Sequence, residues 1–144
     1  MFINLFFADI FKVTYMKNPI TYFEIPADDI EKTKKFYEKI FDWKIEKYDK
    51  DENKYYFVET TDVGEDEWTP VEPGAINGAI VKREDSNEKL IDYIEVDSIE
   101  EMQKKIEKNG GKMIKPKTKM GEWGWWATFK DPEGNEFGLY EEAE

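Results

Sequence analysis

Apolar and polar residues follow one another along most of the chain in two similar series. The first series begins with a β-branched and aromatic run at 20–25, which predicts a strand, followed by apolar positions at helical spacing over 27–41. Residues 43–61 alternate on both sides of an Asp-Glu-Asn turn, which predicts a hairpin, and an acidic loop then leads to a strand at 77–83. The second series repeats this order, with a strand at 90–96, a helix at 97–111 and strands at 112–120, 122–130 and 136–142.

The two series also share the residues expected at the start of their helices. Asp28 followed by Glu31 resembles the capping box that begins a helix, and Asp97 followed by Glu100 repeats it. A shift of 69 residues superimposes the two boxes. Because the order of elements repeats as well, the chain is expected to contain an internal structural repeat.

This repeat predicts an α+β fold made of two βαβββ modules. The modules lie at about 19–83 and 90–142, within a single domain over 16–144. Each module must bury one face of its sheet under its helix. The other faces of the two mixed sheets can curve together and enclose a cavity, and a binding site is expected between the modules.

Residues 1–15 form an apolar N-terminal extension that precedes a second methionine, Met16. The run is too short to span a bilayer, and it lacks the basic start and the cleavage site of a secretory signal. Two interpretations are open: the chain starts at Met16, or the segment packs on the domain or on a second copy. We expect a homodimer formed through residues 1–15.

The composition excludes several kinds of chemistry. The 144 residues include no cysteine and no histidine, which removes disulfides, thiol chemistry and the commonest metal ligand and general base. Any metal would be a hard cation held by carboxylates. A net charge of −12 makes nucleic acid and anionic membranes poor partners. No targeting signal is recognisable, so a cytoplasmic location is expected.

The last part of the chain carries the most specific pattern. The Asp-Pro-Glu-Gly-Asn sequence at 131–135 predicts a tight turn, and the strand after it has Gly138 at its centre. Together with the helix segment that contains Phe36-Tyr37, this turn resembles the vicinal oxygen chelate superfamily of glyoxalases, extradiol dioxygenases and bleomycin-resistance proteins. The resemblance covers residues 19–142 and implies the same two-module fold.

Enzymes of this superfamily usually hold one divalent metal through four side chains, one on each of four strands that face the cavity. By resemblance, the corresponding positions are Tyr22, Gly78, Ile91 and Gly138. Neutral tyrosine, with a pKa of about 10, is a weak ligand, and glycine and isoleucine offer no donor. We therefore expect the fold and its cavity to be kept without the metal or another cofactor.

Alternation along the strands adds further residues to the predicted lining. Ile80 is expected to face the cavity beside Gly78. The other added residues are Glu24, Tyr93, Glu95, Trp126, Glu136 and Tyr140. Such an aromatic and acidic surface attracts planar and cationic molecules. Two alternatives are open, because the rings can be core or dimer contacts and the carboxylates can lie in water at strand ends.

Lys115, Lys117 and Lys119 alternate along a strand that contains proline. This spacing predicts that they share one face of an exposed edge strand, where charge prevents pairing with another sheet. Binding of an anion is the alternative interpretation.

Three functions fit these features. The first, which we expect, is metal-free binding of a small aromatic molecule, in particular a cationic one, as in drug-sequestering relatives. The second is a lyase or isomerase that uses Glu24, Glu95 or Glu136 as a general base or to hold a hard metal. The third is a sensor or scaffold with a vestigial cavity. No catalytic residue is assigned.

Overall fold

Each half of the chain forms a strand, a helix and three further strands, as the sequence predicts. The computed structural model describes residues 17–48 and 55–144. The first half comprises β1 (Ile20–Ala27), α2 (Ile30–Phe41), β2 (Lys44–Lys47), β3 (Tyr55–Glu59) and β4 (Asn77–Lys82). The second comprises β5 (Ile91–Glu95), α3 (Ile99–Lys108), β6 (Lys112–Met120), β7 (Gly124–Lys130) and β8 (Glu136–Glu142). The predicted α+β class with two βαβββ modules is confirmed.

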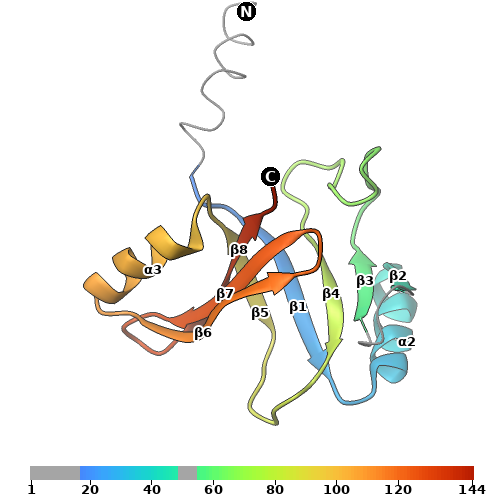
Figure 1. Ribbon diagram of the computed structural model, residues 1–144. Coiled ribbons are helices and arrows are strands. Elements are labelled where there is room, and N and C mark those ends of the chain that lie inside the picture. The colour runs from blue at the N-terminus through green and yellow to red at the C-terminus, as the bar shows by residue number, and fades with distance from the viewer. Residues whose placement is uncertain (1–16, 49–54) are drawn as a thin grey trace, which may run out of the picture.

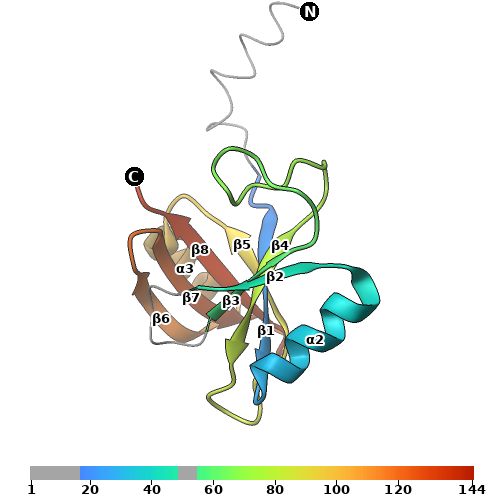
Figure 2. The same cartoon turned by 90° about the vertical axis from the view of Figure 1, so that its right-hand side faces the viewer.

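The strands form one eight-stranded mixed sheet in the order β2-β3-β4-β1-β5-β8-β7-β6. Within each half, the first strand pairs in parallel with the last, β1 with β4 and β5 with β8. The antiparallel pair of β1 and β5 joins the two halves. Figures 1 and 2 show α2 and α3 on the outer sides of the two halves.

Buried apolar side chains lie on both faces of the sheet. Ile80 belongs to the cluster that α2 covers, and Ile99 belongs to the cluster under α3. A third cluster, built around Tyr22 and Tyr93, lies on the face turned away from both helices. We call this face the inner face.

Both helices begin one residue later than the capping boxes predict. The N-caps are Asp29 and Ser98, whose side chains accept hydrogen bonds from the backbone N–H three residues on, at 3.0 Å and 3.2 Å. The assignment of Asp28 and Asp97 as caps is therefore wrong. The residue after each of them also carries an oxygen acceptor, and it lies directly before the first buried isoleucine of the helix.

β6 forms one edge of the sheet, as expected, but it is irregular. Its pairing with β7 shifts between Met113 and Lys115 and again between Lys115 and Thr118. As a result, Nζ of Lys115 lies over the ring of Trp126, whereas Nζ of Lys117 lies over the ring of Trp125. Since neighbouring strand residues point to opposite faces, the prediction that these lysines share one face is wrong.

Two predictions concern residues outside the described ranges. The extension 1–15, with Met16 and the dimer contact expected there, precedes the first described residue. The Asp-Glu-Asn turn at 51–53 lies in the gap between 48 and 55. In the described ranges, no helix combines the length and apolar character needed to cross a bilayer.

Candidate functional site

The centre of the inner face is an aromatic floor built by the two strands that join the halves. Tyr22 of β1 lies opposite Tyr93 of β5, both are buried, and their ring centroids are 5.2 Å apart. Trp68, from the loop before β4, packs on Tyr22 with centroids 5.8 Å apart. Asn77 holds this loop, because its side chain accepts from the Thr60 N–H at 2.8 Å and donates to the Trp68 carbonyl at 3.3 Å. Side chains from both halves therefore form the floor, and Asn77 holds its Trp68 in place.

Gly138 of β8 makes room for one ring of this floor. It lies beside Tyr93 in the parallel pair of β5 and β8. A Cβ atom at Gly138 would lie 2.7 Å from Cγ of Tyr93 and closer still to Cδ2 and Cε2. The space next to this glycine is thus filled by the Tyr93 ring.

Glu24 of β1 places a carboxylate against the floor. Tyr22 donates its hydroxyl proton to Oε2 at 2.7 Å, and Tyr93 donates to Oε1 at 3.0 Å. The hydroxyls of Tyr55 and Tyr22 are also hydrogen-bonded to each other. Because Tyr22 gives its proton to Glu24, Tyr55 must be the donor in that second bond. One carboxylate therefore accepts from two phenols, and a third phenol is hydrogen-bonded to one of them.

The ionisation of these groups follows from their burial. Burial raises the pKa of Glu24, while the hydrogen bonds from Tyr22 and Tyr93 and the charge of Lys115 oppose this rise. Burial, and next the negative charge of Glu24, raise the pKa of Tyr22, Tyr55 and Tyr93 above its ordinary value. The phenols thus stay neutral donors. A carboxyl group in this setting suits either a cationic ligand or proton transfer.

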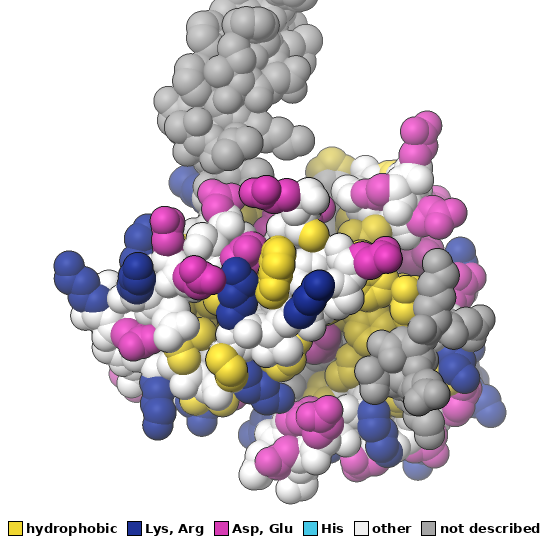
Figure 3. All heavy atoms as spheres, in the orientation of Figure 1, with side chains coloured by type: hydrophobic (Ala, Val, Ile, Leu, Met, Phe, Trp, Pro, Cys, Tyr) yellow, Lys and Arg dark blue, Asp and Glu magenta, His cyan; other side chains and the backbone are white. Residues whose placement is uncertain are grey.

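Half-buried aromatic residues of the second half border the floor. Trp126 and Tyr140 pack against it together with Ile91. Tyr140 donates to the carbonyl of Trp123 at 2.9 Å, and burial raises the pKa of Tyr140 to about 12. Trp123, in the turn between β6 and β7, contacts Phe57 of β3 with ring centroids 5.9 Å apart. The sheet therefore curves until its two halves meet, and Figure 3 shows hydrophobic side chains gathered between them.

The inner face brings together most of the residues predicted for the site, whose role in binding stays a prediction. They are Tyr22, Glu24, Ile91, Tyr93, Trp126, Gly138 and Tyr140. Glu95 is half-buried beside Tyr140, and burial, with the charges of Glu142 and Asp97, raises its pKa. Glu136 is exposed at the start of β8.

The prediction that Gly78 and Ile80 face the cavity is wrong. A Cβ at Gly78 would meet the ring of Phe23, 2.7 Å from its Cδ2, and Phe23 packs with Ile80 in the cluster under α2. The inner-face residue of this strand is Ala79 instead. The expected correspondence between β4 and the last strand of the second module is off by one residue, because the loop before β4 has no counterpart of equal length in the second half.

The positions that the resemblance relates to metal binding do not supply a ligand set. The Tyr22 hydroxyl is committed to Glu24, Ile91 is aliphatic, and the ring of Tyr93 fills the space at Gly138. Gly78 faces away from the other three. Throughout the described part of the chain, no group of three or more acidic side chains could hold a metal ion. The donor chemistry of the inner face thus does not fit the metal of the superfamily's enzymes.

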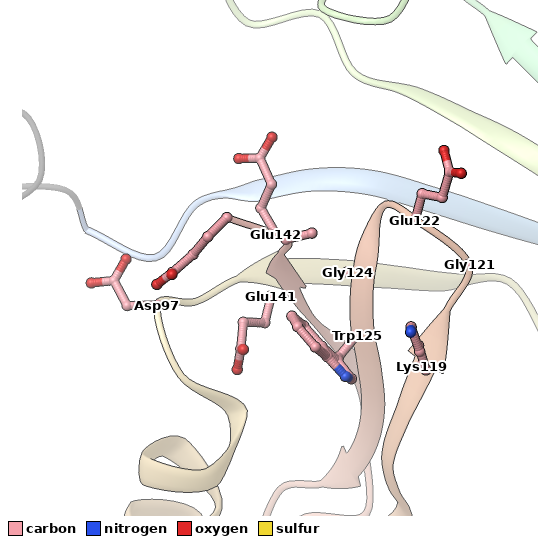
Figure 4. A pocket seen from close by; sticks show the side chains of 10 residues that line it. Asp97, Lys119, Gly121, Glu122, Gly124, Trp125, Glu141 and Glu142 are labelled. Atoms are coloured by element: carbon pink, nitrogen blue, oxygen red, sulfur yellow. The ribbon is translucent and has the colours of Figure 1, made fainter.

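A separate pocket of about 470 Å³ lies where β7 begins and β8 ends. Figure 4 shows that carboxylates from Asp97, Glu122, Glu141 and Glu142 surround it, with Trp125 on one side. Every residue that lines it comes from the second half, so it is not the predicted cavity between the modules.

Tyr55, Trp68 and Lys115 are among the inner-face residues that the predicted set does not contain. Tyr55 lies in the predicted hairpin, where alternation with Phe57 is the signal that could have identified it. Trp68 depends on how its loop folds back, and Lys115 depends on the irregular pairing of β6. Neither feature has a signature in the pattern of apolar residues.

Comparison with known proteins supports the fold. Among solved structures, a hypothetical protein from Bacillus halodurans C-125 is similar with a TM-score of 0.62 and 18% identity, covering 90% of this chain and 97% of that one. Methylmalonyl-CoA epimerase from Mycobacterium tuberculosis gives 0.59 and 11%, covering 92% and 96%. The Streptomyces coelicolor enzyme of the same name gives 0.60 and 12%, covering 90% and 100%. At these identities the likeness shows the fold alone.

No curated protein matches the chain significantly. The family model of the glyoxalase/bleomycin resistance protein/dioxygenase superfamily, by contrast, matches residues 19–139, which covers both modules except the last residues of β8. With the two-module sheet and the structural likeness, this match leads to one conclusion: the chain belongs to the glyoxalase/bleomycin resistance protein/dioxygenase superfamily.

Proposed function

We propose that this chain binds a small aromatic molecule on its inner face without the help of a metal. The observation that carries the proposal is the Glu24 carboxylate, which is held by two phenols and bordered by aromatic rings. Rings attract planar molecules, and a carboxylate of low exposure attracts a cation or a hydrogen-bond donor. An aromatic ammonium compound meets both requirements. The chain would act in the cytoplasm as a binding protein.

The test is a titration of the full chain with benzylamine and benzyl alcohol, followed by tryptophan fluorescence and by calorimetry. Benzylamine is expected to bind more tightly, because only the ammonium adds a charge that faces Glu24. Glu24→Gln should lower the affinity for benzylamine at least tenfold, or about 1.4 kcal/mol, and should lower the affinity for benzyl alcohol by less. Glu133→Gln, in the exposed turn before β8, is the matched control and should change neither affinity. Equal benzylamine affinity in the Glu24 variant would refute the proposal.

A proton-transfer reaction of the lyase or isomerase class is the second candidate. It is favoured by the same carboxyl group, whose pKa is raised by burial and which lies within a hydrogen-bonded set of phenols. Two of the similar structures are also methylmalonyl-CoA epimerases. The test is exchange of the proton next to a carbonyl group for deuterium, measured by NMR across a panel of thioesters and keto acids. Exchange that Glu24→Gln abolishes would favour this candidate over simple binding.

Two further results would change the assignment. Stoichiometric Mn²⁺, Mg²⁺ or Zn²⁺ in protein purified without chelator would contradict metal-free binding. Absence of any fluorescence change or thermal shift across a broad aromatic panel would favour a sensor or scaffold with a vestigial site.

A further inference from the structure

Lys115 is directed toward the inner face by a local distortion of β6. Met113 pairs with Phe129, but Lys115 pairs with Thr128 and Thr118 with Trp126, so β6 carries an extra residue on each side of Lys115. Bulges of this kind re-aim side chains and are common beside binding sites. Regular pairing would have kept Lys115 on the same face as Lys117.

The ammonium group of Lys115 lies against the border of the candidate site. Its Nζ is 5.6 Å from the centroid of Trp126, which packs against the floor. The side chain is half-buried. Its positive charge also acts on Glu24, whose pKa it lowers against the stronger effect of burial. Lys115 thus lies on the same side of the sheet as the carboxylate.

Lys115 and Lys117 differ in their surroundings. Nζ of Lys117 lies 3.4 Å from Glu100 and 3.3 Å from Glu141, on the helix side of the sheet. Among the residues that the structure describes, no carboxylate lies within ion-pair distance of Lys115. A cation–π contact compensates only part of the hydration that a half-buried ammonium loses, so this group retains a strong attraction for an anion.

We propose that Lys115 receives a carboxylate group of the bound molecule, which makes the ligand an aromatic zwitterion. Its ammonium group faces Glu24, its carboxylate faces Lys115, and its ring lies along Trp126. This inference rests on the proposed binding function and adds a second charged contact to it. On a chain of net charge −12, an anionic group finds little other attraction, so Lys115 would determine specificity.

The test compares benzylamine, phenylacetate and para-(aminomethyl)phenylacetate by calorimetry on the full chain. The zwitterion is expected to bind at least tenfold more tightly than benzylamine. Lys115→Met keeps the aliphatic contact with Trp126 but removes the charge, and it should abolish this preference by lowering the affinity for the zwitterion. Lys119→Met, on the same strand but exposed, should keep the preference. Circular dichroism checks that each variant is folded.

The outcomes separate the two proposals. If wild type binds benzylamine and zwitterion equally, or if Lys115→Met keeps the preference, the role of Lys115 is refuted and the binding function stands. If none of the three compounds binds, both proposals fail.

Discussion

Replacement of Gly138 by alanine tests how the inner face is packed. The added Cβ would lie 2.7 Å from Cγ of Tyr93, whereas carbon atoms prefer separations of about 3.5–4.0 Å. The ring cannot move aside freely, because it is buried, packs on Tyr22 at 5.2 Å and donates its hydroxyl to Glu24 at 3.0 Å. We expect Gly138→Ala to lower the free energy of unfolding by about 1–3 kcal/mol, the usual cost of overpacking.

The assay is urea unfolding followed by circular dichroism and tryptophan fluorescence. In thermal unfolding, the melting temperature of Gly138→Ala should fall by about 2–4 °C for each kcal/mol of lost stability. Gly64→Ala is the matched control, because its Cβ would meet no heavy atom closer than 3.9 Å, and it should stay within about 0.5 kcal/mol of wild type. In a Tyr93→Leu background, Gly138→Ala should cost less, which a double-mutant cycle measures. A loss as small as that of the control, or one unchanged in the Leu background, would refute the packing argument.

Three other predictions follow from the same structure. Burial raises the pKa of Glu24 above its ordinary value of 4.5, so its contribution to stability is complete below that pH and is lost as pH rises through the folded pKa. Glu24→Gln should therefore gain stability relative to wild type as the pH rises above 4.5 in urea titrations, and a difference independent of pH would contradict this. An alkaline absorbance titration of the folded chain should leave at least four of the eight tyrosines neutral at about pH 11, among them Tyr22, Tyr55, Tyr93 and Tyr140. Ionisation of more than four tyrosines at that pH, with an unchanged circular dichroism spectrum, would contradict this prediction. Glu141→Ala removes the acceptor of the Ile99 N–H at the start of α3, a 2.7 Å bond, and should cost about 1 kcal/mol in thermal unfolding, whereas the exposed Glu142→Ala should cost little.

The first strand of each module could be read from the sequence because nothing interrupts it before the helix. The alternation from Tyr22 to Glu24 placed both side chains on the inner face, and Tyr93 followed from the repeat. The order of elements was predictable for the same reason, since a short strand, an amphipathic helix and a glycine-rich closing turn each leave a local pattern.

The remaining site features depend on contacts between distant segments. The register of β4 is set by Asn77, which bonds to Thr60 and Trp68 across a long loop, so Gly78 could not be oriented from its neighbours alone. The face of Lys115 depends on extra residues in β6 that alternation cannot detect. The glycine at 138 indicated free space, but only the fold shows that the Tyr93 ring occupies it.

The pairing of β1 with β5 has a consequence for the symmetry of the molecule. Phe23 lies directly opposite Asp92, and these residues are 69 positions apart, the same spacing that relates the two modules. A local twofold axis therefore passes through this pair and through the middle of the aromatic floor. The rotation that exchanges the modules carries Glu24 onto Tyr93 and Tyr22 onto Ile91, so a symmetric frame encloses a site with one polar end. The binding that we propose would therefore take one ligand per chain in a single orientation.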